Sequence, residues 1–371
     1  MKLIAQVKLI TTTEQTDVLK RTMRLTNAAC DYISDAAWEA KTFHQYHLHK
    51  LIYHKTRSVF PALSSQMIVR SIAKVADAYK LDHKRKRSFN PVGGIIYDDR
   101  ILRWYVDKST VSIWTIDGRM HLSFACGERQ QELLQTRQGE SDLVYRDGKF
   151  YLFAVCNIEE PVPDDFDDTL GVDFGIVNIA TDSDGTVHSG AKVNGLRARH
   201  RRLRQKLQKK GTKAARRLLK KRGRKEHRFG KHENHCISKQ IVKKAKDTKR
   251  AIAIENLTGI RLRTTVRKAD RATHDSWSFY DLRAKIEYKA RRAGVAVFAV
   301  DPRNTSRTCP VCGCIDKANR KTQSQFLCVR CGHSGLADTI AAINISRRAA
   351  SKPAILLDST ISCVVGKSSP F

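Results

Sequence analysis

The sequence predicts a mixed chain in which a small antiparallel β-barrel is followed by an α/β domain. Two hairpin patterns predict the barrel: strand-like residues flank Asp117-Gly118 in TVSIWTIDGRMHLSFA and Asp147-Gly148 in LVYRDGKFYLFAV. The opening stretch Lys2–Ile10 supplies a further strand. In the second half, buried strand-like runs occur together with helical patterns, which is typical of a sheet covered by helices.

Composition marks the domain boundaries. Six acidic residues crowd together with Pro161 and Pro163 between Glu159 and Asp168, a pattern typical of a solvated linker. We therefore expect the following parts: a barrel at 1–12 and 80–165; a helical insert at 13–79; an α/β domain at 166–304 and 334–350 with basic helices at 196–250; a cysteine-bearing insertion at 305–333; and a disordered tail at 351–371.

The overall charge indicates a polyanionic partner. The 371 residues carry 69 Lys and Arg against 37 Asp and Glu, a formal net charge of +32, and 41% hydrophobic residues are enough to fold. Nucleic acid is the first candidate partner, and an anionic membrane surface is the second. No run of about 18 apolar residues occurs and the start lacks the layout of a signal peptide, so we expect neither secretion nor membrane spanning.

More than half of the excess charge lies in one helix-forming segment. Between Arg197 and Lys231 there are eighteen Lys and Arg residues and one acid, Glu226. Gly211 should break this segment, and Thr212 should cap a second helix that ends near Gly223. A solvated helix usually interleaves both signs of charge, so we expect contact with phosphates instead. The predicted nucleic-acid-binding side chains are Arg197, Arg199, Arg201, Arg202, Arg204, Lys206, Lys209, Lys210, Arg216, Arg217, Lys220, Lys221 and Arg222.

Four of the ten cysteines form two close pairs, Cys309/Cys312 and Cys328/Cys331, with fifteen residues between the pairs. This spacing is typical of one tetrahedral zinc ion, and a glycine after each pair relieves crowding where the chain turns. Four thiolates leave no open position, so the zinc should be structural. The alternative, a pair of disulfides, is disfavoured in a reducing compartment.

Three carboxylates stand out in the second half. Asp173 in LGVDFGIVNI shares one strand face with Gly171 and Gly175, which should leave an open pocket beside it. Glu255 ends the buried strand AIAIE, and Asp338 lies on a helix whose small residues should allow close approach to a sheet. Bringing such carboxylates together is costly without cations. We therefore expect two Mg²⁺ ions acting on a phosphodiester.

Other catalytic arrangements find little support. Asp301 is the main rival for a place among the acids, but Pro302 follows it and favours a turn. There is no Ser/His/Asp arrangement and no glycine-rich loop of the kind that cradles phosphates.

The order of motifs resembles TnpB, a transposon-encoded family of RNA-guided nucleases related to the type V CRISPR effectors. The resemblance spans roughly Leu170 to Arg348 and rests on LGVDFGIVNIATDSDG, SKQIV, IAIENLTGI, WSFYDLRAKIEYKA, NTSRTCPVCG, CVRCGH and ADTIAAINI. The N-terminal half matches only in outline.

The resemblance implies an RNase H-like (RuvC) nuclease domain whose catalytic acids, and magnesium ligands, correspond to Asp173, Glu255 and Asp338. The cysteines would fall in the zinc-binding insertion of the family. The implied partners are a structured guide RNA from the transposon end and double-stranded target DNA, which is cut beside a short target-adjacent motif. The implied location is the cytoplasm of a prokaryote, at the nucleoid.

One residue departs from the family pattern. Ile340 stands in Asp338-Thr-Ile-Ala-Ala where the family usually has asparagine, and the missing amide could weaken cleavage without removing a ligand. Two alternatives therefore stay open at this stage. One is an RNA-guided DNA-binding regulator with weak or no cleavage, and the other is a conventional DNA transposase.

Overall fold

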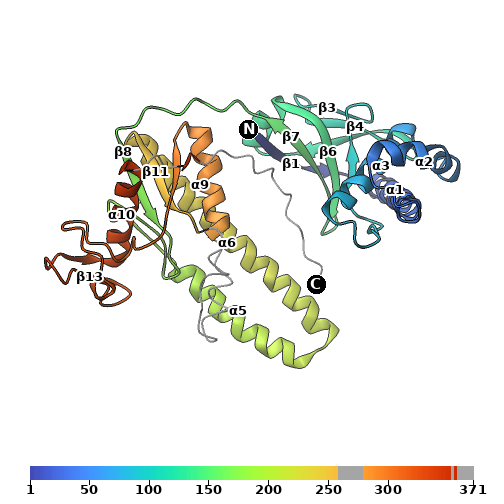
Figure 1. The fold of residues 1–371 in the computed structure, drawn as a ribbon. Coiled ribbons are helices and arrows are strands. Elements are labelled where there is room, and N and C mark those ends of the chain that lie inside the picture. Colours follow the sequence, from blue (N-terminus) through green and yellow to red (C-terminus); the bar gives the residue numbers. More distant parts are fainter. Residues whose placement is uncertain (258–278, 352–354, 357–371) are drawn as a thin grey trace. The chain divides into compact units, whose positions relative to one another are not determined.

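The computed structural model of the protein describes residues 1–257, 279–351 and 355–356 (Figure 1). It divides into two compact units, Met1–Glu159 and Glu160–Phe371. Most of the tail predicted at 351–371 lies outside the described residues, although Ile355–Leu356 form a short strand, β15. The last three residues of the IAIENLTGI motif and the first two of WSFYDLRAKIEYKA also lie outside them.

The first unit is built on a near-closed antiparallel barrel of seven strands in the order β2-β6-β7-β1-β5-β4-β3. Strand β1 (Lys2–Ile10) is central and alternates between exposed and buried residues, with Ala5, Val7 and Leu9 facing the core. The other strands are β2 (Ile95–Tyr97), β3 (Leu102–Tyr105), β4 (Thr110–Thr115), β5 (Gly118–Ala125), β6 (Arg137–Arg146) and β7 (Lys149–Asn157), and helix α4 (Glu128–Gln135) joins β5 to β6.

Both predicted hairpins are present, although one turn is shifted. Arg146 pairs with Lys149 across a two-residue loop in which Asp147 and Gly148 both have positive φ, as the Asp-Gly sequence predicts. In the other hairpin Thr115 pairs with Gly118, so the loop is Ile116-Asp117, one residue earlier than predicted.

Three helices interrupt the barrel between β1 and β2: α1 (Thr13–Glu39), α2 (Gln45–Val59) and α3 (Ser65–Leu81). Thr12 and Gln15 form a capping box at the start of α1, which satisfies backbone groups that the first turn leaves free. The apolar faces of the three helices join the barrel interior in one core, through residues such as Leu19, Met23, Ile33, Leu48, Ile52, Ile68 and Ile72.

The second unit contains a mixed sheet in the order β10-β9-β8-β11-β12-β15. Strands β8 (Asp168–Asp173), β11 (Arg250–Glu255) and β12 (Val297–Val300) run parallel, whereas the remaining strands pair antiparallel. Strand β8 pairs with β9 (Asn178–Asp182), which in turn pairs with β10 (Val187–Ser189). The carboxyl ends of the three parallel strands therefore meet at one edge of the sheet.

Helices cover both faces of this sheet. Leu170, Val172, Ile252 and Ile254 face a core that they share with α6 (Lys213–Asp247) and α9 (Phe279–Ala293). On the other face lies α10 (Ala337–Ser351), whose Ile345 packs with Ala253 and Val300 (Figure 1).

Gly171 allows the close approach of α10. A Cβ atom at this position would lie 1.9 Å from the carbonyl oxygen of Ala342 and 2.7 Å from the amide nitrogen of Ser346. The space beside this glycine is therefore filled by the helix backbone. The open pocket predicted beside Asp173 does not arise from Gly171, because that glycine serves helix packing.

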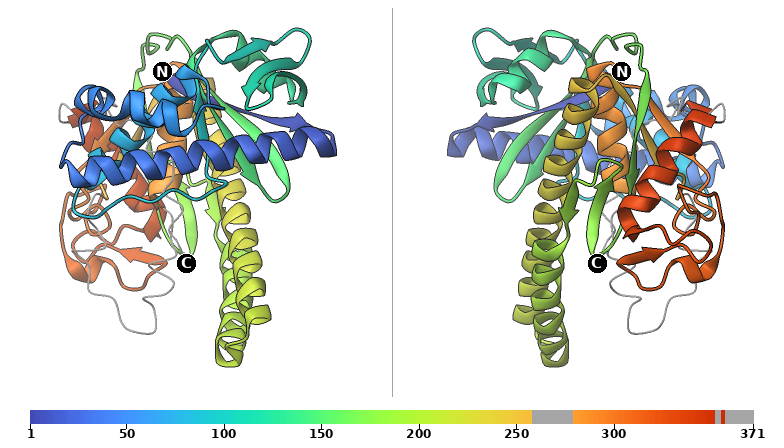
Figure 2. Two further views of the ribbon diagram at one scale, coloured as in Figure 1. Left: turned by 90° about the vertical axis from the view of Figure 1, so that its right-hand side faces the viewer. Right: turned by 90° about the vertical axis from the view of Figure 1, so that its left-hand side faces the viewer.

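Helices α5 (Ala191–Lys210) and α6 form a long hairpin that extends from the sheet (Figures 1 and 2). Gly211 ends α5 in the left-handed conformation, and the Thr212 side chain accepts a hydrogen bond from the Ala215 amide, as predicted. The predicted end near Gly223 is wrong, because α6 continues for 35 residues. A helical glycine costs only about 1 kcal/mol, which its helix-forming neighbours and the packing against α5 can offset.

Between β12 and α10 lies a small module with a 3-10 turn (Lys317–Asn319) and the two-stranded sheet β13 (Gln325–Leu327) and β14 (Ser334–Leu336). It holds the cysteine pairs. Within the described part of the chain, no helix combines the length and apolarity that crossing a bilayer would need.

Candidate active site

The three predicted carboxylates line one cavity of about 510 Å³ at the carboxyl edge of the parallel strands. Val172 pairs with Ile254, so Asp173 and Glu255, the next residues, lie side by side at the ends of β8 and β11. Both point to the α10 face, because the residues that alternate with them face α6 and α9. Asp338 reaches the same cavity from the first turn of α10. The fold thus brings together acids that are 165 positions apart in sequence.

The cavity opposes ionisation of its acids. Burial raises the pKa of Asp173 to about 8, and the nearby carboxylates of Glu255 and Asp338 add to the shift. Burial also raises the pKa of Glu255, which is only 8% exposed, against the effect of a hydrogen bond from Thr305. A cation in the cavity would offset the cost of ionising these buried carboxyl groups.

Three side chains that sequence analysis did not single out hold the acids in place. The Thr305 hydroxyl donates to Oε1 of Glu255 at 2.6 Å, and the Asn178 amide donates to Oδ2 of Asp338 at 2.9 Å. Arg320 brings Nη2 to 3.7 Å from Oδ1 of Asp338. Asn178 and Thr305 belong to the motifs LGVDFGIVNI and NTSRTCPVCG, and this membership was the feature of the sequence that could have indicated them. Arg320 lies between the cysteine pairs, outside these motifs, and no sequence feature indicated it.

The spacing of the carboxylates is wider than that of the cysteines. Among the described residues, the four cysteines form the one group of three or more potential ligands whose atoms all lie within 4.8 Å of one another. The acids therefore surround the cavity and do not converge on a single point. Asp301, their rival, is exposed and accepts a hydrogen bond from the Arg303 amide, which is the turn role that Pro302 predicts.

The four cysteines form two nearly identical turns. In each, the first cysteine amide donates to a carbonyl five residues on, and the glycine after the pair donates back to the first cysteine: Cys309 with Cys314 and Gly313, and Cys328 with His333 and Gly332. Gly313 and Gly332 have φ of 71° and 72°, a conformation that favours glycine. The thiols pair across the turns, with Sγ–Sγ distances of 3.6 Å for Cys309–Cys331 and 3.5 Å for Cys312–Cys328. This cluster is consistent with a structural zinc site.

Ile340 belongs to the cysteine cluster. It is 4% exposed and packs with Cys309, Phe326 and Cys328, whereas it does not line the cavity of the acids. Two residues after Asp338 along a helix, a side chain points to a different face. The departure at position 340 therefore changes the packing under the cysteines and leaves the surroundings of Asp338 to Asn178 and Arg320.

The basic side chains predicted to bind phosphates lie on the α5–α6 hairpin. Twelve of the thirteen are exposed. Glu226, the acid among them, is tied to the inner side of the hairpin, where its Oε2 lies 3.1 Å from Nδ1 of His200 and 3.2 Å from Nη2 of Arg204. The outward surface of the hairpin is therefore almost entirely cationic.

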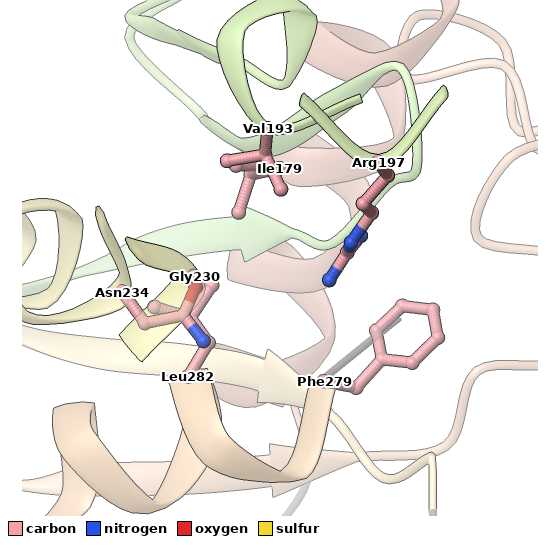
Figure 3. A pocket seen from close by; sticks show the side chains of 7 residues that line it. All are labelled: Ile179, Val193, Arg197, Gly230, Asn234, Phe279 and Leu282. Atoms are coloured by element: carbon pink, nitrogen blue, oxygen red, sulfur yellow. The ribbon is translucent and has the colours of Figure 1, made fainter. Parts of the chain in front are cut away.

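Arg197 is the exception among these residues. It is half-buried and extends toward Phe279 in a small cavity that Ile179, Val193 and Leu282 also line (Figure 3). Burial lowers the pKa of its guanidinium, against the opposing charge of Glu226. Arg197 is therefore placed where α5 meets the sheet and is not part of the exposed cationic surface.

Comparison with known proteins finds relatives that share parts of this sequence. A family model described as "Cas12f1-like, TNB domain" matches residues 279–345. The CRISPR-associated endodeoxyribonuclease Cas12f1 of Sulfoacidibacillus thermotolerans is 41% identical over 114 residues, which is 30% of this chain and 26% of that protein. The TnpB-like protein MJ0751 of Methanocaldococcus jannaschii is 29% identical over 198 residues, covering 50% of this chain and 70% of that protein.

A further relative is InsQ of Escherichia coli K12, which carries the name "Putative RNA-guided DNA endonuclease InsQ". It is 39% identical over 67 residues, covering 18% of this chain and 17% of that protein. The matched part thus spans about a quarter of the first Cas12f1 relative. Among solved structures, a Cas12f1–sgRNA–target DNA complex aligns with a TM-score of 0.59 at 15% identity, over 91% of this chain and 83% of that one. A mini-RNA-guided endonuclease, CRISPR-Cas_phi3, aligns with a TM-score of 0.58 at 11% identity, over 94% and 92%.

The structural matches establish a shared fold, and the family model covers the segment that carries Asp338 and the four cysteines. In sequence, over part of the chain, and in fold, the protein is therefore similar to TnpB-like and Cas12f proteins.

Proposed function

We propose that the protein is an RNA-guided DNA endonuclease of a transposon. One observation carries this proposal: Asp173, Glu255 and Asp338 line a single open cavity at the carboxyl edge of a parallel sheet. The relatives named as RNA-guided DNA endonucleases support it, as does the Cas12f1 complex with guide RNA and target DNA. In this proposal the second unit is an RNase H-like (RuvC) nuclease domain, and the protein acts at the prokaryotic nucleoid.

The cavity suits divalent magnesium. Its donors are carboxylate oxygens, which this hard cation prefers, and burial, together with the nearby carboxylates of Glu255 and Asp338, raises the pKa of Asp173. Because the three groups surround the cavity and are not all within 4.8 Å of one another, they fit a pair of ions better than a single ion. Bound magnesium would activate a water molecule and stabilise the leaving oxygen of a phosphodiester.

The neighbouring side chains keep the acids in position. Thr305 orients the Glu255 carboxylate, and Asn178 does the same for Asp338. Arg320 brings a positive charge to the cavity wall, where it can hold a phosphate oxygen of the DNA strand. These contacts fix geometry before substrate arrives, so that little reorganisation is needed during reaction.

The α5–α6 hairpin supplies backbone affinity. Its exposed cations would bind phosphates of the guide RNA or of the guide–target duplex, while base pairing supplies sequence specificity. The cysteine cluster would hold one structural zinc ion, since four thiolates close the coordination shell.

The test begins with the RNA. The protein is purified from its native host, the co-purifying RNA is sequenced, and the complex is incubated with Mg²⁺ and a plasmid library in which a matched target is flanked by random bases. We expect a defined transcript and cleavage of plasmids that carry one short flanking motif. Asp173→Asn should bind the same RNA without cutting.

Two results would redirect the assignment. Tight, motif-dependent binding with intact DNA would identify an RNA-guided regulator. Strand transfer that survives RNase treatment would identify a conventional transposase.

A further inference from the structure

Asn319 is a fully buried polar residue within the module that holds the cysteines. Its exposed fraction is 0%, and both the nitrogen and the oxygen of its side-chain amide form hydrogen bonds. Nδ2 donates to the carbonyl oxygens of Arg307 at 2.9 Å and Cys314 at 3.1 Å, while Oδ1 accepts from the Val329 amide at 2.9 Å. These backbone groups precede the first cysteine pair, follow it, and lie inside the second. One carboxamide therefore ties together both turns of the cluster.

The next residue, Arg320, points into the cavity of the acids. Its guanidinium lies 3.7 Å from Asp338 and donates to the carbonyl oxygen of Gln323 at 3.1 Å. The positive charge also acts on Asp173 and Glu255, where it favours the ionised forms. A buried anchor and a charged side chain at the cavity wall are thus adjacent in sequence.

We propose that Asn319 is a positioning residue that sets the place of the Arg320 charge over the three carboxylates. The folded cysteine cluster thereby controls how strongly the cavity binds cations. This inference rests on the proposed function of the same cavity and adds a link between its two metal sites. No contact of Asn319 with the acids is needed, because the effect passes through the backbone to Arg320.

The sign of the effect separates positioning from general stability. A guanidinium near Asp338 competes with a divalent cation for the same negative charge, so moving it away should tighten cation binding. A variant that merely loosened the fold would scatter the acids and weaken binding. At a partly solvated site the gain should be roughly three- to tenfold in affinity.

The experiment measures Ca²⁺ and Mg²⁺ binding to the full chain by calorimetry, without nucleic acid, and zinc content on the same samples. The variants are Asn319→Ala, Arg320→Gln and their combination. We expect each single variant to tighten binding by a similar factor, the double variant to tighten it no further, and zinc to remain at one ion per chain. Independent, multiplying effects would overturn the proposal, as would an Asn319→Ala protein with zinc and wild-type cation affinity.

A matched control removes another buried side-chain amide, that of Asn344. Asn344 is also buried, and its Nδ2 donates to the carbonyl oxygens of Thr305 and Thr308, both at 2.7 Å. It does not contact the segment that bears Arg320, so Asn344→Ala should leave cation binding unchanged or weaker. Tighter cation binding in this variant would contradict an effect that passes from Asn319 to Arg320.

Two further variants keep the outcome decisive. If Asn319→Ala loses zinc, Asn319→Asp takes its place beside Arg320→Gln and in the double variant, because aspartate preserves the shape of the side chain and the acceptor for the Val329 amide. Zinc loss in both Asn319 variants, with weakened cation binding, would make Asn319 purely structural. Asp173→Asn reports on the cavity itself. If it binds cations as the wild type does, the proposed function fails; if it loses binding while Asn319 variants change nothing, only the inference fails.

Discussion

Burial and two neighbouring carboxylates oppose ionisation of the Asp173 side chain. It ends a buried strand beside Glu255 and faces Asp338, and the pKa near 8 reflects burial first and these neighbours second. In the folded protein this acid holds a proton that the unfolded chain releases near pH 4. Stability without a cation must therefore fall as pH rises between these two values, and the penalty is complete above about pH 8.

Asp173→Asn should consequently stabilise the cation-free protein in a pH-dependent way. We expect a rise in melting temperature of several degrees at pH 8 and a much smaller one at pH 4.5, measured by thermal unfolding in buffer without added divalent cations. Addition of Mg²⁺ at pH 8 should raise the melting temperature of the wild type and not of the variant. Equal changes at both pH values would show that Asp173 is not strained by its charge.

At the scale of single elements, the contact between β8 and α10 depends on one missing side chain. Gly171→Ala would place a methyl group 1.9 Å from the Ala342 carbonyl, and a helix backbone cannot yield as a flexible side chain can. We expect a loss of about 3 kcal/mol in the free energy of unfolding, measured with denaturant. Cleavage should fall as well, because α10 carries Asp338.

Gly195→Ala is the matched control for that change. No atom lies within 4 Å of a Cβ built at Gly195, which is inside α5. Alanine there should be neutral or stabilise the helix by up to about 1 kcal/mol. A similar loss in both variants would point to a cause other than the β8–α10 contact.

The α5–α6 hairpin should act mainly through its charge. Replacing Arg216, Arg217, Lys220 and Lys221 by glutamine removes four exposed cations and keeps helix propensity. The slope of log affinity against log salt should fall by about 2–4 for guide RNA, with circular dichroism unchanged. A slope equal to that of the wild type would exclude this part of α6 from the phosphate contacts.

The length of this hairpin illustrates what the local sequence leaves open. Gly211 and Thr212 define a helix break, because a left-handed residue and a capping hydroxyl act on their own neighbours. Gly223 and Gly230 have the same residue type but lie inside α6. The helix continues through both glycines to residues such as Ile241 and Ala245, which pack in the core of the sheet.

At the scale of the whole molecule, each of the two units has its own core, and the cysteine cluster belongs to the second. Removing zinc with a strong chelator, or replacing Cys309 by serine, should therefore lower one calorimetric unfolding transition and leave the other in place. A single transition that shifts as a whole would show that the units unfold together.

The sequence by itself determined the local features of this protein: the Asp147-Gly148 turn, the Gly211–Thr212 break, the cysteine spacing, and the strand faces of Asp173 and Glu255. Each of these depends on residues within a few positions of one another. Only the tertiary structure decided that Gly171 admits a helix backbone, that Ile340 packs beneath the cysteines, and that Thr305, Asn178 and Arg320 hold the acids. These contacts join positions up to about 170 residues apart, so they depend on how strands and helices pack, which no local pattern encodes.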